Sequence, residues 1–116
     1  MKALNTLELL AAFKDDKTFI GVFALDQIPM DQILPLTKTV KFIANLEPIS
    51  LLGSHWVAVK RTNGHGFYFD SFGRLPPHNI QCWLANNCNF WTYNRQVVQD
   101  VSDKTICGYL CILFLK

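Results

Sequence analysis

Two runs of strand-forming residues separated by Asn63-Gly64 place the strongest constraint on how this chain can fold. Asn-Gly is the dipeptide most typical of a two-residue hairpin turn, because both central residues of a type I′ turn need positive φ. The flanking runs, 54–61 and 66–72, are rich in aromatic and β-branched residues. The sequence therefore predicts an antiparallel hairpin in the middle of the chain.

The same turn predicts the register of the hairpin. If the two turn residues are central, Val57 lies opposite Asp70, and His55 lies opposite Phe72. His55 and Asp70 are then diagonal neighbours on one face, with Cα atoms about 7–8 Å apart, so the carboxylate can reach the imidazole. A loop of odd length would put the two side chains on opposite faces, and Gly66 just beyond the turn keeps that alternative open.

His55, Asp70 and Cys107 are residue types that work together in nucleophilic catalysis. A thiol becomes a nucleophile when a base takes its proton, and the base needs a third group to hold its tautomer. Taken singly, each residue is more typical of an ordinary role: a packed histidine, a turn-initiating aspartate and a small buried hydrophobe. The hairpin register joins two of them, and this combination favours catalysis.

Cys107 is the best candidate nucleophile of the four cysteines. It lies near the start of a predicted helix, 105–115, whose positive end lowers the pKa of a thiol. Cys111 lies one turn further along and is expected to be buried and inert, while Cys82 and Cys88 are expected to pack. The spacings Cys82-x5-Cys88 and Cys107-x3-Cys111 are not those of paired zinc knuckles, so no metal is expected.

Further candidates lie on either side of Cys107. Gly108 has no side chain and lets a substrate or another backbone approach closely. A tetrahedral oxyanion needs a donor such as a side-chain amide, and one such donor is worth about 3–4 kcal/mol in the transition state. We favour Gln99 over Gln96 for this role, although both residues also suit a solvent-facing position.

The remaining patterns predict an α+β fold with a central antiparallel sheet and flanking helices. Helical spacing is present at 4–13, after Pro77 to about Asn86, and at 105–115, where the helix is apolar all round, as a buried helix would be. Extended patterns are present at 18–25, at 38–46, which reads as a half-buried strand, and at 90–98.

Composition limits the classes of protein that the chain can be. With 116 residues, half of them apolar, it is expected to form one domain over 1–116. The formal charge of +2 is too small to indicate nucleic acid, and no apolar stretch reaches the roughly 18–20 residues of a membrane span. Without a signal-peptide pattern we expect an intracellular protein, not a secreted one, whose four cysteines are thiols.

Five segments of the chain resemble the adenovirus endopeptidase (adenain) and its relatives in other DNA viruses and large self-synthesising transposons. They occur in the order of that family and together cover about 18–116: Phe19–Phe23, Gly53–Ala58, Phe67–Gly73, Val98-Gln99 and Cys107–Cys111. The SUMO-deconjugating proteases share this order and carry Asp at the acid position, as this chain does, whereas adenain carries Glu.

The resemblance implies a papain-like cysteine proteinase fold in a permuted order of catalytic residues. By this likeness His55 is the general base, Asp70 orients it, Gln99 is the oxyanion donor and Cys107 is the nucleophile. Trp56 would line a narrow cleft beside the histidine and favour small residues such as glycine near the scissile bond.

The resemblance also implies a cysteine endopeptidase that cleaves capsid or core precursor proteins in the host cytoplasm or nucleus, or in the virion. We expect no cofactor. Adenain is stimulated by a viral peptide and by DNA, but nothing basic or peptide-binding in this sequence supports either partner. The chain ends nine residues after Cys107, whereas adenain continues, so we expect a minimal or truncated core. The alternatives are a protease that deconjugates ubiquitin-like proteins and a non-catalytic interaction protein with a protease fold.

Overall fold

The computed structural model describes residues 3–30, 35–46, 55–98 and 106–116, which form an α+β fold, as predicted. In chain order the elements are α1 (Thr6–Ala12), β1 (Phe19–Ala24), the 3₁₀ helix η1 (Leu25–Gln27), β2 (Val40–Asn45), β3 (Trp56–Thr62), β4 (His65–Phe69), α2 (His78–Asn87), β5 (Phe90–Tyr93) and α3 (Cys107–Leu115). β5 is shorter than the predicted strand at 90–98, since its ladder with β4 ends at Tyr93.

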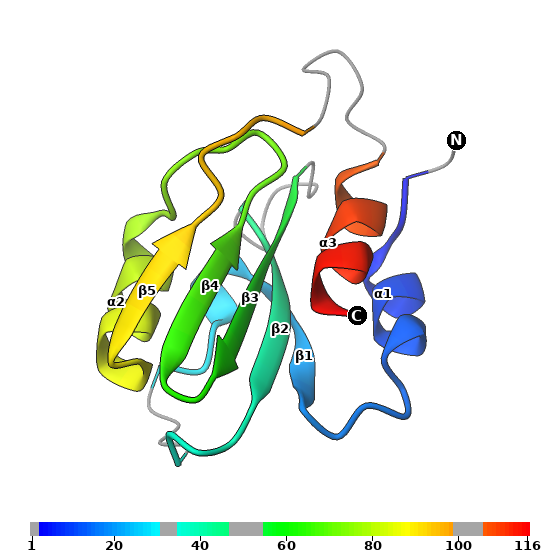
Figure 1. Cartoon of the computed structure of the whole chain (residues 1–116). Coiled ribbons are helices and arrows are strands. Elements are labelled where there is room, and N and C mark those ends of the chain that lie inside the picture. The colour runs from blue at the N-terminus through cyan, green and yellow to red at the C-terminus, as the bar shows by residue number, and fades with distance from the viewer. Residues whose placement is uncertain (1–2, 31–34, 47–54, 99–105) are drawn as a thin grey trace.

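The five strands form one mixed sheet in the order β1-β2-β3-β4-β5. β3 is antiparallel to β2 and to β4, but β1 runs parallel to β2 and β5 runs parallel to β4. The predicted antiparallel sheet is therefore wrong for both outer strands. A parallel neighbour needs a connection that returns the chain to the same end of the sheet, and α2 lies in that connection between β4 and β5 (Figure 1).

The hairpin between β3 and β4 has the predicted turn and register. Asn63 and Gly64 have φ of 50° and 79°, the positive values that a type I′ turn requires. Thr62 pairs with His65, and the same register continues to the pair Ala58 and Phe69. The hairpin therefore delivers its two strand ends, one just after His55 and one just before Asp70, to the same end of the sheet.

Helices cover both faces of the sheet. α1 and α3 lie side by side on one face, and α2 lies on the other (Figure 1). The apolar side chains of α1 and α3 pack with β2 and β3 through Leu9, Cys111, Leu115, Ile43 and Ala58. Those of α2 pack with β2, β3 and β4 through Ile80, Trp83, Leu84, Phe42, Val57 and Tyr68. The result is a three-layer arrangement with a core on each side of the sheet.

This layering corrects two burial predictions. β2 is buried on both faces and not half-buried, because Phe42 faces the α2 layer while Ile43 faces the α1–α3 layer. α3 is not buried all round: Leu113 is 73% exposed, since only one side of the helix meets the sheet. Apolar composition alone does not distinguish an inner strand from an outer helix.

Two close contacts hold α2 against the sheet. Gly66 lies under α2, where an added Cβ would come within 2.7 Å of the Cys88 Sγ and 2.8 Å of a Leu84 methyl carbon. The side chain of Arg61 is fully buried and donates to the carbonyl oxygens of Asn87, Pro35 and Lys38 at 2.9, 2.6 and 3.0 Å. Arg61 therefore joins the end of α2 to the segment that precedes β2.

Candidate active site

Three chain segments that are far apart in the sequence meet at one end of the sheet. They are the start of β3, the end of β4 and the first turn of α3 (Figure 1). His55 precedes β3, Asp70 follows β4, and Cys107 is the first residue of α3. The structure thus brings together the three residues that the sequence predicts to act together.

His55 and Asp70 form a buried, charge-assisted hydrogen bond. The His55 Nε2 lies 2.7 Å from the Asp70 Oδ1, and Asp70 has no exposed surface. An ionised carboxylate only accepts hydrogen bonds, so the Nε2 carries the proton and donates it. This contact leaves the Nδ1 of the imidazole for Cys107.

Phe72, in the turn after β4, contacts both the Asp70 carboxylate and the His55 imidazole. The Asp70 Oδ1 also accepts the backbone N–H of Phe72 at 2.8 Å, and the Asp70 carbonyl accepts the N–H of Gly73 at 2.7 Å. Gly73 has φ of 69°, a left-handed conformation that glycine adopts without strain. The Phe72 ring stacks on the His55 ring with centroids 4.6 Å apart. Asp70 is therefore both a turn-initiating aspartate and the partner of the histidine.

Cys107 lies beside the imidazole with its sulfur held by the backbone. The N–H of Trp56 donates to the Cys107 Sγ at 3.4 Å, and Cys107 is 2% exposed. Burial by itself raises the pKa of the Cys107 thiol, but hydrogen bonds from His55 and from the Trp56 N–H, with the positive charge of His55, outweigh burial and lower it. The thiolate is therefore favoured at this position.

The pKa of His55 shifts in the direction that complements the thiol. Burial alone lowers the pKa of His55, whereas its hydrogen bonds to Asp70 and to the Cys107 sulfur raise it, to about 9 in total. Because the pKa of His55 is raised and that of Cys107 is lowered, both shifts favour the imidazolium–thiolate pair. This pair of charges is the reactive state of a catalytic cysteine.

The other three cysteines lack this environment. Cys111 is fully buried, and burial followed by the nearby negative groups Cys107 and Asp70 raises its thiol pKa well above the ordinary value. Burial also raises the pKa of Cys88, which packs against the sheet. Cys82 lies on α2, where its Sγ is 3.4 Å from the His78 Nε2. Among the four, Cys107 alone combines a lowered pKa with contact to His55.

Trp56 and Gly108 lie beside the nucleophile and contact each other. The Trp56 indole N–H donates to the Leu4 carbonyl oxygen at 3.1 Å. A Cβ on Gly108 would come within 3.3 Å of both the Trp56 ring and the Leu4 Cβ. In this structure Leu4 and Trp56 fill the space next to the Gly108 Cα, and the substrate-binding role of the two residues stays a prediction.

The predicted oxyanion donor, Gln99, lies outside the described residues. Its neighbour Val98 is described: the Val98 N–H donates to the Ser71 carbonyl oxygen at 2.8 Å. Gln96, the competing candidate, is exposed, and its carbonyl oxygen accepts a hydrogen bond from the Asn94 side chain at 3.1 Å. The chain therefore passes next to Asp70 immediately before Gln99.

Asn94 is a residue of this site that sequence reasoning missed. Its Oδ1 accepts the Asp70 N–H at 2.9 Å, and its Nδ2 donates to the Asp70 carbonyl oxygen at 2.6 Å. The contact joins positions 24 residues apart, and no motif or spacing in the sequence marks it. Only the pairing of β5 with β4 brings the two residues together.

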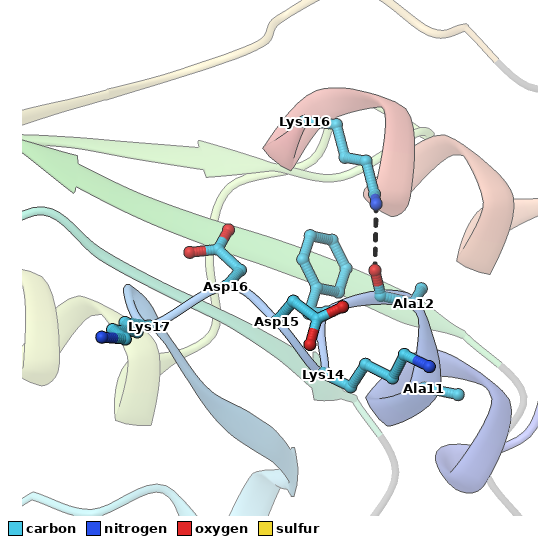
Figure 2. A pocket seen from close by; sticks show the side chains of 8 residues that line it. Ala11, Ala12, Lys14, Asp15, Asp16, Lys17 and Lys116 are labelled. Atoms are coloured by element: carbon cyan, nitrogen blue, oxygen red, sulfur yellow. Dashed lines mark hydrogen bonds between the residues drawn. The ribbon is translucent and has the colours of Figure 1, made fainter.

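A surface hollow of about 530 Å³ lies elsewhere, lined by 11–17 and Lys116 (Figure 2). The Lys116 Nζ donates to the Ala12 carbonyl oxygen at 2.9 Å across it. Lys116 follows the last residue of α3, whereas Cys107 is the first, so the hollow is at the far end of that helix. Because no cysteine or histidine lines it, we do not assign the chemistry to this hollow.

Two kinds of feature are absent from the described residues. In 3–30, 35–46, 55–98 and 106–116, no group of three or more His, Cys, Asp and Glu side chains is placed to hold a metal ion. No helix within the same ranges has the length and apolar character needed to cross a membrane.

Comparisons with known proteins bear on the fold. No protein-family model and no curated protein matches the sequence. Among solved structures, a crystal structure of the ASFV pS273R protease matches with a TM-score of 0.65 and 18% identity, over 97% of this chain and 56% of that one. A selenomethionine crystal structure of that protease matches 66% of this chain and 32% of the other, with 23% identity and a TM-score of 0.48.

At this level of identity the first match shows the fold. Nearly all of this chain has the fold of a viral protease, as the resemblance in its sequence predicts. The chain spans about 56% of the length of that protease. What the larger protein does is therefore not transferred to this chain by the match alone.

Proposed function

We propose that this chain is a cysteine endopeptidase that cleaves viral or transposon capsid or core precursor proteins at glycine-containing sites. The observation that carries the proposal is the unbroken line of contacts from Asp70 through His55 to Cys107, in which the pKa of the base is raised and that of the thiol is lowered. The fold of the ASFV pS273R protease supports the reaction class. The likeness to adenain supports the substrate class.

The first half of the reaction forms an acyl-enzyme. The Cys107 thiolate adds to the peptide carbonyl carbon, a C–S bond forms, and the carbonyl π electrons move to the oxygen. Protonated His55 gives its Nδ1 proton to the amine nitrogen as the C–N bond breaks, because an amine leaves far more readily than an amide anion. The products are a thioester on Cys107, a free amine and neutral His55.

The second half releases the acid. Neutral His55 takes a proton from water while the water oxygen adds to the thioester carbonyl carbon. When this second tetrahedral species collapses, the C–S bond breaks, and thiolate and imidazolium return together. Asp70 accepts the Nε2–H throughout, which keeps the Nδ1 directed at the reaction and stabilises the imidazolium.

We propose two donors for the oxyanion of both tetrahedral species. The first is the backbone N–H of Cys107, because the positive end of a helix lies at its first N–H groups. The second is the side-chain amide of Gln99. Gln99 directly follows Val98, whose N–H donates to the carbonyl oxygen of Ser71, the residue after Asp70. Gln96 is less suited, since the residue is exposed and lies two residues before the hydrogen bond between the Val98 N–H and Ser71.

The surroundings of Cys107 support a preference for small residues near the scissile bond. The Trp56 ring is held by its hydrogen bond to Leu4 and lies against Gly108, one residue from the nucleophile. A large ring fixed next to both the base and the nucleophile narrows the approach to the thiolate. Glycine is the residue that a narrow approach admits most readily.

Peptide cleavage by matched cysteine variants tests the proposal. Wild type, Cys107→Ala and Cys111→Ala are incubated with precursor-type peptides that contain a Gly-x-Gly site, and the products are identified by mass spectrometry. We expect cleavage by wild type and by Cys111→Ala, and none by Cys107→Ala. If Cys111→Ala loses cleavage and Cys107→Ala retains it, Cys107 is not the nucleophile.

A second substrate separates the alternatives. A ubiquitin-like precursor with a Gly-Gly tail is tested beside the capsid-type peptides. Preferred cleavage of that precursor would replace the proposed substrate with a ubiquitin-like protein. If either substrate binds without being cleaved, and the Cys107 thiol is as unreactive as the Cys111 thiol, the chain is instead a non-catalytic interaction protein.

A further inference from the structure

Asn94 holds Asp70 by both groups of its peptide backbone. The Asn94 side chain accepts the Asp70 N–H at 2.9 Å and donates to the Asp70 carbonyl oxygen at 2.6 Å. A side-chain amide carries one acceptor and one donor group, the same pair that a neighbouring strand would present. The side-chain amide of Asn94 therefore binds the Asp70 backbone as the peptide groups of a paired strand would.

Asn94 lies directly after the end of the β4–β5 ladder, where its side chain can pair with the Asp70 backbone. The parallel ladder between β4 and β5 ends at the pair Tyr68 and Tyr93, directly before Asn94. Beyond it β4 ends at Phe69 and the chain turns from Asp70 to Gly73, so Asp70 lies outside the ladder. The Asn94 N–H still donates to the Tyr68 carbonyl oxygen at 3.4 Å, and the Asn94 side chain continues the pairing to Asp70.

Asp70 links the contact with Asn94 to the imidazole of His55. Asp70 is fully buried, and its Oδ1 binds the His55 Nε2 at 2.7 Å and the Phe72 N–H at 2.8 Å. If the backbone of Asp70 moves by a few tenths of an ångström, the short contact to His55 lengthens and weakens, because hydrogen bonds depend steeply on geometry. Fixing the backbone therefore fixes the carboxylate that orients the base.

We propose that Asn94 is a positioning residue, which holds the Asp70 carboxylate against His55 and thereby keeps Cys107 in its reactive form. The inference rests on the function proposed above, because Asn94 acts through Asp70 and His55 and does not touch the reacting atoms. Asparagine suits the position since aspartate lacks the donor and an aliphatic side chain lacks both groups.

The test follows the reactivity of the thiol and needs no substrate. The rate at which iodoacetamide alkylates Cys107 is measured from pH 4 to pH 10 by site-resolved mass spectrometry, in wild type, Asn94→Ala and the matched control Asn87→Ala. Asn87 is also a buried asparagine: its Nδ2 donates to the Trp83 carbonyl oxygen at 2.9 Å, away from the site. Should Asn94→Ala fail to fold, Asn94→Ser, which keeps a hydroxyl acceptor, is measured in its place.

In Asn94→Ala we expect the alkylation midpoint to rise by about one pH unit, which leaves about tenfold less thiolate well below the midpoint. Asn94→Ser should give a smaller rise, and Asn87→Ala none. Peptide cleavage should lose kcat with KM little changed. An unmoved midpoint in the Asn94 variant, or an equal rise in Asn87→Ala, would overturn the inference.

The two proposals can fail separately. If Asn94→Ala raises the alkylation midpoint as expected but wild type cleaves no peptide, the peptidase proposal is contradicted and the role of Asn94 stands. A protein that cleaves peptides with the same pH profile in wild type and Asn94→Ala contradicts only the role of Asn94.

Discussion

Replacing Asp70 by asparagine removes one negative charge from a fully buried position and leaves the size of the side chain nearly unchanged. The contact at stake is the 2.7 Å hydrogen bond between the Asp70 Oδ1 and the His55 Nε2. A hydrogen bond to a charged group contributes about 1.5–3 kcal/mol, and one pKa unit corresponds to 1.36 kcal/mol. The pKa of His55, about 9 in the wild type, should therefore fall by about one to two units in Asp70→Asn.

The sign of the effect on the active state follows from the two pKa shifts. A lower pKa of His55 means that the imidazolium loses its proton at a lower pH, so the descending limb of the pH–activity profile moves down from about 9. A smaller fraction of that cation near neutral pH also removes part of what lowers the Cys107 pKa, so the ascending limb moves up. The pH range in which imidazolium and thiolate coexist becomes narrower from both sides.

The His55 titration can be measured directly by NMR with labelled histidine, in wild type and in Asp70→Asn. The chain has three histidines, and His65 and His78 lie away from the site and serve as internal controls. Alkylation of Cys107 across the same pH range reports the thiol. A His55 titration midpoint that does not move in Asp70→Asn would refute the argument that Asp70 is what raises it.

Three further predictions concern stability. Hydrogen bonds from Thr18 and then Lys41 lower the pKa of Asp16 to about 2, so their stabilisation is present above about pH 4 and is lost as the pH falls through about 2. Thermal unfolding should show Asp16→Asn less stable by at most about 1 kcal/mol at pH 7 and by much less at pH 2, and equal stability at pH 7 would contradict this. Gly66→Ala pushes a methyl group against α2 and should lower the free energy of unfolding by about 1–3 kcal/mol in urea; a neutral result would mean that α2 can shift. Arg61→Met leaves three carbonyl groups without their donor, and urea unfolding should show a loss of about 3 kcal/mol, whereas an unchanged midpoint would show that these carbonyls find other partners.

Local chemistry predicted the parts of this fold that depend on neighbours in the sequence. The type I′ turn at Asn63 and Gly64 sets the register of the hairpin, and that register places His55 and Asp70 at the same end of the sheet, as the sequence predicts. The start of α1 is local in the same sense, since Asn5 and Glu8, three residues apart, form a capping box. Such features are set by the geometry of a few adjacent residues.

Other features could not be read because they depend on segments that meet only in the folded chain. The sheet is mixed and not antiparallel because of how the connections run between strands, which strand patterns do not encode. β2 is covered on both faces because helices pack on both sides of it, although its alternating residues resemble a half-buried strand. The choice of Gln99 as oxyanion donor stays a prediction.

The sequence by itself therefore determined the chemical types of the site and half of its geometry: a histidine and an aspartate placed together by a two-residue turn, and a cysteine at the head of a helix. The tertiary structure decided that this cysteine meets that histidine across 52 positions, and that Asn94 binds Asp70. The physical reason is range. A turn restricts the dihedral angles of adjacent residues, whereas a contact between distant segments exists only when the sheet and both helical layers have packed.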